Sequence, residues 1–447
     1  MRPWVTTVAG DADLPEAVDL VVIGGGIIGC SAALWAAEQG LRVALLEKGR
    51  IAGEQSGRNW GWVRRMGRAA AEYPLGIASL TLWAGLNARI GRDTGFRRCG
   101  IVYGAGSARE EAWLDGVEAE ARRFGLGVMR LDRAGLADHF PGARLAATTA
   151  LMTADDGRAE PALAAPALAE GARDAGAAVL TNCAVRGLET EAGRVSAVVT
   201  ERGVIRCGAA ILAAGAWSRL FCGNLGIDLP QVRVRSSVLR TAPVAGGPAL
   251  ALGTGRFGIR PRADGGYTVA RRGRTPGQLT HDLLRQAPRF AAGLRQNRRE
   301  ISLTVDRSLI DTLVTPRRWR GDEISPFERC RVLDPAPQDR LLAAALRDVC
   351  HSFPALAGVP VRERWGGIID VTPDGVPVID HAPRLPGLVI ATGFSGHGFG
   401  LGPGAGQLAA ELATGAAPLV DPAPFRLARL PGARRAAAAA GPLHEGA

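Results

Sequence analysis

The sequence predicts an α/β fold with a second domain of α+β type, and three observations support this prediction. A short apolar strand, a glycine-rich turn and a helix of small residues follow one another between residues 19 and 40. The same succession returns between residues 387 and 412. From residue 231 to about 315 the pattern changes to strands with Gly- and Pro-rich turns, typical of an antiparallel sheet. The 447 residues are enough for two or three domains.

The first glycine-rich turn carries the strongest local signal. Leu20–Ile23 is an apolar, β-branched run that suits a strand buried on both faces of a parallel sheet. Gly24, Gly26 and Gly29 follow it as G-x-G-x-x-G. In this motif the first glycine permits a tight turn, the second lets the backbone approach a pyrophosphate, and the third lets the helix pack closely on the strand. Unpaired amides and the helix dipole would attract the phosphates.

An acidic residue completes this unit. Leu41–Leu46 forms a second apolar strand, and Glu47 ends it 23 positions after Gly24. A carboxylate at this place hydrogen-bonds the ribose hydroxyls of an adenosine and disfavours a 2′-phosphate. The unit therefore predicts a Rossmann-like domain that binds FAD or NAD rather than NADP. A βαβ unit without any nucleotide is the alternative.

The loop after Glu47 is dense in Gly, Ser, Asn, Arg and Trp. Ser56, Arg58 and Asn59 offer groups that suit phosphate and ring-carbonyl contacts. Trp60 and Trp62 could stack on a planar ligand or wall it, although tryptophans in a loop also serve as core anchors. We expect residues 56–61 to contact the cofactor.

The rest of the chain alternates between helical and extended patterns. A Gly-rich loop is expected at 393–400, a loop with a short strand at 136–154, and a peripheral tail after residue 422. Residues 432–447 of this tail are low-complexity and are expected to form a frayed end. Helices are predicted at 69–90, 110–124, 161–175, 336–351 and 404–412, and strands at 96–103, 179–201, 209–213 and 388–391.

Composition and charge limit the classes of partner. The net charge is +11, and Lys48 is the only lysine beside 53 arginines. Residues 260–320 hold 14 arginines against five acidic residues. No nucleic-acid motif or aromatic platform accompanies them, so we expect no nucleic-acid partner but a solvated face that could attract an acidic substrate or partner.

The cysteines and the apolar runs indicate the compartment. Seven cysteines lie scattered without a C-x-x-C pair, which argues against a disulfide framework and favours a reducing compartment. The histidines have no pattern that suggests metal ligands, so no metal is expected. The N-terminus lacks a signal-peptide core, and no apolar run is long enough to span a bilayer. We expect a cytoplasmic protein, with peripheral association at the inner face of the membrane left open.

Five motifs in order resemble the D-amino-acid oxidase-like superfamily of flavoenzymes, which includes glycine oxidase, sarcosine oxidase and bacterial D-amino acid dehydrogenases. They are VVIGGGIIGCSAALWAAEQG with Glu47, SGRNWG (56–61), ILAAGAWS (211–218), WGGIIDVTPDGVPVI (365–379) and GLVIATGFSGHGFGLGPGAGQLAAEL (387–412). The resemblance spans residues 19 to about 415. It implies FAD, bound by a Rossmann-like domain (GR2-type) made of residues 15–95, 150–230 and 352–420. It also implies an antiparallel-sheet substrate domain made of residues 96–149 and 231–351, with 421–447 as a C-terminal tail. We expect the FAD to be non-covalent, because Gly367 stands where some members have a flavin-linked cysteine.

The resemblance also implies which residues contact FAD. The glycines of the first turn would hold the pyrophosphate, Glu47 the ribose and Val185 the adenine, while the amides of 396–400 would lie at the pyrimidine side of the flavin. The full set of implied contacts is Gly24, Gly26, Ile27, Ile28, Gly29, Glu47, Lys48, Gln55, Ser56, Arg58, Asn59, Trp60, Gly61, Val185, Ala214, Gly215, Trp217, Gly396, His397, Gly398, Phe399 and Gly400.

The implied reaction is oxidation of the C–N bond of an amino acid or amine. The substrate gives hydride to flavin N5, and the resulting imine hydrolyses to an oxo product. Oxidation of a 2-hydroxy acid, and a non-catalytic role as a flavin-bound subunit of a larger complex, are the alternatives. No acid/base pair is required, so the catalytic residues are unknown, with His397 as a weak candidate.

Three departures from the family pattern bear on substrate and acceptor. The arginine that clamps a carboxylate in glycine oxidase-like enzymes is replaced by Ile369, so Arg64, Arg260 and Arg262 become candidates for this role. Asp370 could bind a substrate cation or only cap a turn, and Trp62 could also meet the substrate. Gly367 stands where sarcosine oxidase-like enzymes have the flavin-linked cysteine. The oxygen-activating lysine is absent as well, which favours a dehydrogenase; O2 and a quinone or carrier both stay open as electron acceptors.

Overall fold

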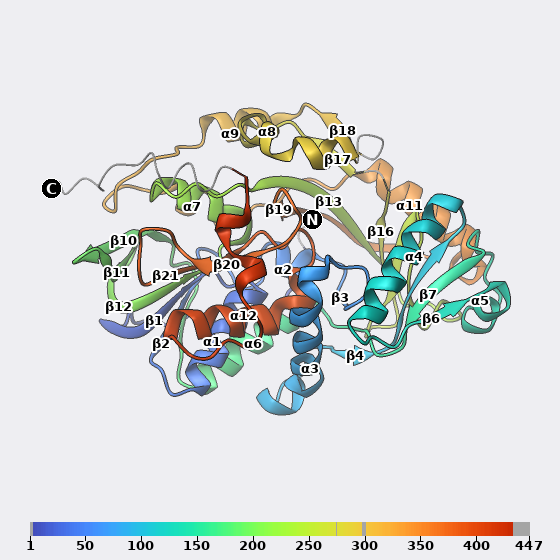
Figure 1. The fold of residues 1–447 in the computed structure, drawn as a ribbon, viewed down its shortest axis with the longest axis horizontal. Coiled ribbons are helices and arrows are strands. Elements are labelled where there is room, and N and C mark those ends of the chain that lie inside the picture. The colour runs from blue at the N-terminus through green and yellow to red at the C-terminus, as the bar shows by residue number, and fades with distance from the viewer. Residues whose placement is uncertain (1–2, 274, 297–300, 432–447) are drawn as a thin grey trace.

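Two eight-stranded sheets form the body of the protein (Figure 1). The computed structural model describes residues 3–273, 275–296 and 301–431. The low-complexity tail from residue 432 onward, expected as a frayed end, lies outside the described residues.

The first sheet is built around the first glycine motif. Strand β1 (Ala17–Ile23) lies between two parallel neighbours, β2 (Val43–Leu46) and β12 (Gly203–Leu212). All four residues of β2 are buried, as a run of apolar residues in a parallel sheet requires. The order is β10-β11-β12-β1-β2-β9, with β21 joined to β12 and β20 to β21. The other strands are β9 (Ala178–Leu180), β10 (Val185–Glu191), β11 (Arg194–Thr200), β20 (Val378–His381) and β21 (Leu388–Thr392).

Three helices cover one face of this sheet, and a fourth packs against them. Helix α1 (Ile27–Glu38) packs against α6 (Ala164–Asp174) and α12 (Gly398–Thr414), and α12 packs against α3 (Tyr73–Ile90). The contact between α1 and α12 is close because glycines form it. A Cβ on Gly402 would lie 2.5 Å from the Ile27 side chain, and one on Gly406 would lie 2.5 Å from Ser31. The segment of small residues in the C-terminal part of the chain is therefore needed to bring the two helices together.

The second sheet is antiparallel except at one pair of strands. Its order is β19-β13-β16-β15-β14-β5-β7-β6, and β14 runs parallel to β5. Helices α4 and α11 pack on it. The strands are β5 (Ile101–Ala105), β6 (Met129–Leu131), β7 (Thr149–Thr153), β13 (Val232–Thr241), β14 (Ala251–Gly253), β15 (Phe257–Pro261), β16 (Tyr267–Arg271) and β19 (Val361–Val371), and the helices are α4 (Ala108–Arg123), α5 (Arg133–His139) and α11 (Asp339–Ser352).

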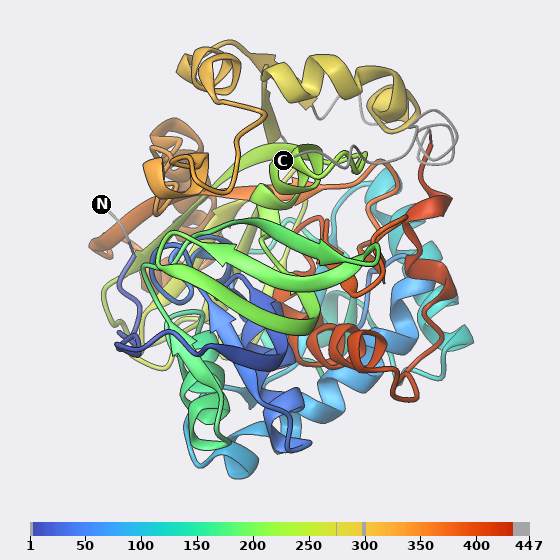
Figure 2. The same cartoon turned by 90° about the vertical axis from the view of Figure 1, so that its left-hand side faces the viewer.

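A separate layer lies over one side of the molecule (Figures 1 and 2). It contains β17 (Thr275–Gln278), α8 (His281–Gln296), β18 (Ile301–Thr304) and α9 (Arg307–Val314). The prediction of strands throughout residues 231–315 was wrong here. Gly and Pro residues suggested turns, but Pro288 lies inside α8.

Three further element predictions need correction. The predicted strand 96–103 is interrupted at Gly100, whose positive φ of 73° separates β4 (Arg97–Arg98) from β5. The predicted loop at 136–154 overlaps α5, which Asp132 caps by accepting a hydrogen bond from the Gly135 amide. Helix α12 begins at Gly398, within the loop expected at 393–400, rather than at residue 404.

Sheet membership differs from the expected segment boundaries at two places. Strand β19 lies in the segment 352–420, which was expected with the nucleotide-binding sheet, but it pairs with β13 of the second sheet. Strand β7 extends past residue 149 into the segment expected in the first. The remaining short elements are α2 (Gln55–Arg58), β3 (Trp62–Val63), η1 (Ala70–Glu72), β8 (Gly157–Arg158), η2 (Gly215–Trp217), α7 (Ser218–Asn224), α10 (Pro326–Arg329), η3 (Pro354–Leu356), η4 (Ala423–Phe425) and η5 (Leu427–Arg429).

In the described ranges, no helix is both long and apolar enough to cross a bilayer. The same residues contain no group of three or more His, Cys, Asp or Glu side chains placed to hold a metal ion.

Candidate active site

A cavity of about 420 Å³ receives residues from both sheets. The first turn, the loop after β2, strand β19 and the start of α12 all reach it. Most residues expected at the cofactor or substrate line this cavity: Gly24, Gly26, Ile27, Ile28, Glu47, Lys48, Gln55, Ser56, Arg58, Asn59, Trp60, Trp62, Arg64, Val185, Ala214, Gly215, Trp217, Asp370, Gly396, His397, Gly398 and Phe399. Gly29, Gly61, Gly400, Arg260 and Arg262 are not among the lining residues.

The glycines of the first turn differ in what surrounds them. A Cβ on Gly24 would lie 2.5 Å from the Ala213 carbonyl oxygen, and one on Gly29 would lie 2.0 Å from the Gly24 carbonyl oxygen. At these two positions, backbone atoms leave no room for a side chain. A Cβ on Gly26 would meet only the Ser56 hydroxyl, at 3.1 Å. Gly26 therefore faces the open space of the cavity, whereas Gly24 and Gly29 serve the tight turn and the packing of α1.

Side chains from the next strand and loop bind the amides of this turn. The Gly25 amide donates to one oxygen of Glu47 at 2.8 Å, and the Gly49 amide donates to the other at 2.8 Å. The Ile27 amide donates to the Ser56 hydroxyl at 2.8 Å. Burial raises the pKa of the Glu47 carboxyl, and Lys48 together with the two amides opposes that rise. The carboxylate is thus fixed at the edge of the cavity by the backbone around it.

The Lys48 side chain is held at the edge of the cavity by hydrogen bonds to neighbouring segments. Its ammonium donates to Glu54 at 2.6 Å and to the carbonyls of Cys330 and Arg331. It also lies 4.5 Å from the ring centroid of Trp217, whose indole N–H donates to the same Glu54. With these partners, the lysine holds the loop around Glu54 to the segment that directly follows α10.

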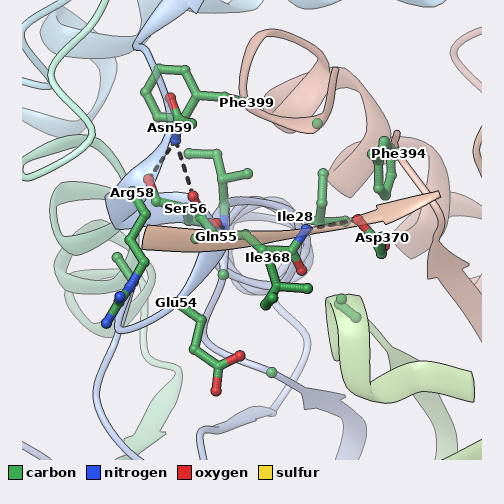
Figure 3. A pocket seen from close by; sticks show the side chains of 18 of the residues that line it. Ile28, Glu54, Gln55, Ser56, Arg58, Asn59, Ile368, Asp370, Phe394 and Phe399 are labelled. Carbon is green, nitrogen blue, oxygen red and sulfur yellow. Dashed lines mark hydrogen bonds between the residues drawn. The ribbon is translucent and has the colours of Figure 1, made fainter. Parts of the chain in front are cut away.

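The loop at 54–61 is held by its own hydrogen bonds (Figure 3). The Asn59 amide donates to the Ser56 carbonyl at 2.7 Å and its oxygen accepts from the Gly61 amide at 2.7 Å. Arg58 is buried and donates to Asp334 at 2.6 Å and to the Gly366 carbonyl at 2.9 Å. Its Nη2 has no hydrogen-bond partner among the described residues. Arg58 therefore joins the loop to the second sheet and keeps the two N–H bonds of Nη2 for another partner.

Asp370 is a junction between segments. One of its oxygens accepts from the Gln55 side-chain amide at 2.7 Å, as Figure 3 shows. The other accepts from the Gly393 amide at 2.7 Å, the Gln231 side chain at 3.0 Å and the Thr392 hydroxyl at 3.2 Å. Burial raises the pKa of this carboxyl. Through these bonds Asp370 connects β19 to the second glycine turn, and its binding of a substrate cation stays a prediction.

The second glycine turn brings another helix N-terminus to the cavity. Gly393 and Gly396 have φ values of 74° and 87°, which permit the sharp reversal between β21 and α12. No side chain caps the first turn of α12, so its free amides and dipole favour negative charge there. Gly400 lies inside the helix, where its carbonyl accepts from Ser79 and Trp83. This glycine serves helix packing and is not among the lining residues, and its contact with the flavin stays a prediction.

His397 is oriented by a buried carboxylate. Its Nδ1 lies 2.9 Å from Glu72, which is fully buried. Burial lowers the pKa of His397, while His397 and Arg68 hold the pKa of the Glu72 carboxyl below its usual value despite its burial. A neutral imidazole that donates its Nδ1–H to a Glu72 carboxylate satisfies both directions. The sequence contained no signal for this pair, because its members are 325 positions apart.

The arginines expected to bind a substrate carboxylate lie in two different places. Arg260 is 1% exposed and pairs with Glu160 at 2.8 Å; Arg262 lies 3.8 Å from the same carboxylate. Neither is among the residues that line the cavity, and both lie against Glu160, so the structure gives their expected role no support. Arg64 does line the cavity, but its Nη1 donates to the carbonyls of Met66 and Gly67.

Arg272 was missed by the sequence-based reasoning. It lines the cavity beside Tyr103, with its guanidinium 5.0 Å from the ring centroid. In the part of the chain that the structure describes, it has no ion pair and no side-chain hydrogen bond. It follows β16, and its neighbour Arg271 points the other way to Asp348 at 2.5 Å. The two-residue period of a strand was the available signal, since it sends one of two adjacent arginines inward.

Aromatic side chains wall the same part of the cavity. Trp60 and Trp62 both line it, with their rings 5.5 Å apart in an edge-to-face arrangement. Trp62 meets Tyr103 in the same way at 5.8 Å. Phe394 and Phe399 line it from the second glycine turn. The cavity thus combines two helix N-termini, the Glu47 carboxylate, the Arg272 guanidinium without an ion pair among the described residues, and a largely apolar wall.

Known proteins share this architecture. The family model for FAD dependent oxidoreductases (DAO) matches residues 19–412. N-methyl-L-tryptophan oxidase of Salmonella typhi is 28% identical over 424 residues, which cover 92% of this chain and 98% of that protein. L-amino acid deaminase from Proteus myxofaciens, solved in complex with anthranilate, has a TM-score of 0.92 at 34% identity, covering 96% of this chain and 97% of that one.

The similarity to a further structure concerns the fold alone. Glycine oxidase from Geobacillus kaustophilus has a TM-score of 0.75 at 21% identity, covering 93% of this chain and 100% of that one. The predicted resemblance to D-amino-acid oxidase-like flavoenzymes is confirmed, and with it FAD as the cofactor. The chain belongs to the family of FAD dependent oxidoreductases.

Proposed function

We propose that this protein oxidises the C–N bond of an amino acid and uses FAD as the electron acceptor. The observation that carries the proposal is that the cavity with the two glycine turns also contains Arg272. A guanidinium without an ion pair among the described residues suits a carboxylate. The oxidised substrate is an imine, which water hydrolyses to an oxo product and ammonia or a smaller amine. The named activities of the deaminase and oxidase relatives support this substrate class.

The residues around the first turn fit an adenosine diphosphate group. The open side of Gly26, with the positive end of the α1 dipole, would receive the pyrophosphate, and Glu47 the ribose. Ser56 and the free Nη2 of Arg58 would add donors for the phosphates. Val185, Lys48 and Trp217 would lie at the adenine end.

The second turn fits the flavin. Gly396, Gly398 and the uncapped amides of α12 would face the pyrimidine side, where positive potential stabilises negative charge on the reduced ring. Gly367 lines the cavity and offers no thiol, so we propose that FAD is held without a covalent bond at that position. When bound, FAD supplies the two-electron acceptor for the reaction.

The second sheet would hold the substrate. Arg272 would fix the carboxylate, and Tyr103 beside it would keep the guanidinium in place through a cation–π contact. Trp60 and Trp62 would exclude water and limit the size of the side chain. We thus propose the first sheet as the FAD-binding part and the second sheet as the substrate-binding part.

A 2-hydroxy acid is a second candidate, because it carries the same carboxylate that suits Arg272. The names of the relatives favour the amino acid. An anaerobic screen tests the proposal directly. L- and D-amino acids, N-methyl amino acids and 2-hydroxy acids are each mixed with the purified holoenzyme, and the flavin absorbance is followed. We expect bleaching by amino acids only; bleaching by hydroxy acids alone would overturn the assignment.

The acceptor that takes the electrons from reduced FAD is part of the same proposal. The only lysine in the chain is bonded to Glu54, so no lysine is placed to help activate oxygen at the flavin. This favours transfer to a quinone or carrier over O2. We propose a cytoplasmic protein that can associate with the inner face of the membrane.

A further inference from the structure

Two arginines that line the cavity have no ion pair among the described residues. Four other lining lysine and arginine side chains each have a carboxylate partner: Lys48 with Glu54, Arg58 with Asp334, Arg68 with Glu72 and Arg331 with Glu201. The two that remain are Arg64 and Arg272, and both are partly buried. A shielded guanidinium without a counter-charge is costly unless a ligand supplies one.

Both arginines lie against the same aromatic ring. The guanidinium carbon of Arg64 is 5.9 Å from the centroid of the Tyr103 ring, and that of Arg272 is 5.0 Å from it. Gly253 makes room for Arg272, because a Cβ at this glycine would meet the Arg272 Nη1. Burial lowers the pKa of Arg272, and the nearby Arg64 charge lowers it further. The cavity therefore holds two positive charges close together beside the second sheet.

Arg64 presents the edge of its guanidinium that suits a carboxylate. Its Nη1 donates to the Met66 carbonyl at 2.5 Å and to the Gly67 carbonyl at 2.8 Å, which fixes the group in place. Its Nε and Nη2 have no hydrogen-bond partner in the described part of the chain. Elsewhere in this protein, Arg186 binds Glu328 through the same two nitrogens, at 3.0 and 2.8 Å. Arg64 thus keeps a bidentate site for a carboxylate.

The acidic side chains of the cavity wall do not supply the missing counter-charges. Those among the described lining residues are Glu47, Glu54 and Asp370. Each already accepts hydrogen bonds, either from Lys48 or from amides of the two glycine turns. Glu110, which raises the pKa of Arg272, is not among the lining residues. The part of the cavity beside Tyr103 is therefore positive before a substrate enters.

A substrate with one carboxylate leaves one of the two charges uncompensated. The α-carboxylate of an amino acid engages one guanidinium in a bidentate manner. The bound substrate then displaces water from the second guanidinium, and an unpaired charge shielded from water is unfavourable. A second carboxylate on the substrate removes this cost and adds two charge-assisted hydrogen bonds at Arg64.

We propose that the substrate is an acidic amino acid of the aspartate or glutamate type. Arg272 would bind its α-carboxylate and Arg64 its side-chain carboxylate. This inference rests on the proposed function and names the substrate class of the same site. The substrate would pass its α-hydrogen as hydride to FAD and release one proton. Water would then replace the nitrogen and give the corresponding 2-oxo diacid and ammonium, so that atoms and charges balance.

Acids and their matched amides test the substrate class directly. Aspartate, glutamate, asparagine and glutamine are each mixed with the holoenzyme without oxygen, as both enantiomers, and flavin bleaching is followed. The amides match the acids in size but carry one carboxylate. We expect half-maximal bleaching rates at concentrations about 10- to 100-fold lower for an acid than for its amide.

Binding without turnover gives a second measurement. Glutarate and pentanoate have the same number of carbons, and neither carries a nitrogen to be oxidised. We expect glutarate to bind the oxidised holoenzyme at least about tenfold more tightly than pentanoate, as measured by the shift in flavin absorbance. Equal affinity for the two compounds would overturn the proposal, because it would show that only one carboxylate is recognised.

A substitution at Arg64 assigns the second carboxylate to this residue. Arg64→Met should reduce the preference for glutarate over pentanoate to nearly none. Arg256→Met removes an exposed arginine that does not line the cavity and should keep the wild-type preference. Flavin content and thermal unfolding show whether both variants fold. If Arg64→Met does not fold, the two wild-type comparisons decide; a folded Arg64→Met protein that keeps the preference would contradict the assignment.

The outcomes separate this inference from the proposed function. Bleaching by asparagine or glutamine as readily as by the acids would overturn the substrate class and leave C–N oxidation standing. Bleaching by no amino acid would contradict the proposed function and, with it, this substrate class.

Discussion

The two strand–turn–helix units that border the cavity differ in how far along the sequence their hydrogen-bond partners lie. At β1–α1, the partners of the turn are near in sequence: Glu47 accepts from the Gly25 amide and Ser56 from the Ile27 amide. At β21–α12, they are distant: Asp370 accepts from the Gly393 amide, and Glu72 holds His397. The first unit is thus a local motif, whereas the second is positioned by the rest of the fold.

The largest effect is expected from a substitution at Gly29 of the first unit, where backbone atoms leave no room for a side chain. Gly29→Ala would place a methyl group 2.0 Å from the Gly24 carbonyl oxygen. Because a backbone atom cannot move aside cheaply, we expect the free energy of unfolding to fall by about 3 kcal/mol or more. Urea unfolding of the apoprotein measures this. Gly116→Ala, in α4 with nothing within 4 Å, is the control and should be neutral or slightly stabilising.

The next largest effect is expected at Gly26, where a substitution should weaken cofactor binding without affecting folding. Gly26→Val points a branched side chain into the space proposed for the pyrophosphate, where the native backbone meets only Ser56. We expect FAD affinity to fall at least about tenfold while the apoprotein still unfolds like the wild type. The ratio of flavin to protein after gel filtration reports the loss. Wild-type flavin content in this variant would contradict the placement of the pyrophosphate.

A smaller effect tests the substrate side. Arg272→Met removes the guanidinium but keeps most of the side-chain length, so KM for an amino acid should rise roughly 10- to 100-fold. Steady-state kinetics measure this change. Arg271→Met is the matched control, because Arg271 pairs with Asp348 instead of lining the cavity. A similar KM increase in both variants would show that the effect is structural.

The smallest expected effect is on the pH dependence of folding stability, through His397 at the second glycine turn. His397 has a lowered pKa, so the unfolded chain binds its proton more readily than the folded one. The stability from neutral His397 is therefore complete above the ordinary histidine pKa of about 6.5 and is lost as the pH falls below it. Thermal unfolding from pH 8 to 5 should show a weaker dependence in His397→Asn than in the wild type.

A control keeps this measurement specific. His351→Asn changes an exposed histidine, and its unfolding temperature should follow pH as the wild type does. If His397→Asn also keeps the wild-type dependence, the assignment of a neutral imidazole bonded to Glu72 is wrong.

The comparison explains which features the sequence could predict. The strand, glycines, helix and Glu47 were predictable, because each is specified within about thirty residues by hydrophobic period and fixed spacing. Arg58, Arg260 and Asp370 were assigned by residue type. Their partners Asp334, Glu160 and Gln231 lie 276, 100 and 139 positions away, so no local pattern could show these contacts.

The same limit applies to elements that tertiary contacts stabilise. Helix α8 contains Pro288 and is held to the body through Asp282, so local propensity predicted turns instead. Arg272 could have been found from the alternation of β16, but the choice between two adjacent arginines required the position of Asp348.

The flavin content of the purified chain tests the central claim most directly. After acid precipitation, the supernatant is analysed for flavin, and the amount is compared with that of protein. One FAD per chain, released entirely into the supernatant, is the predicted result. A colourless chain that takes up no added FAD, or flavin that stays on the precipitate, would contradict it.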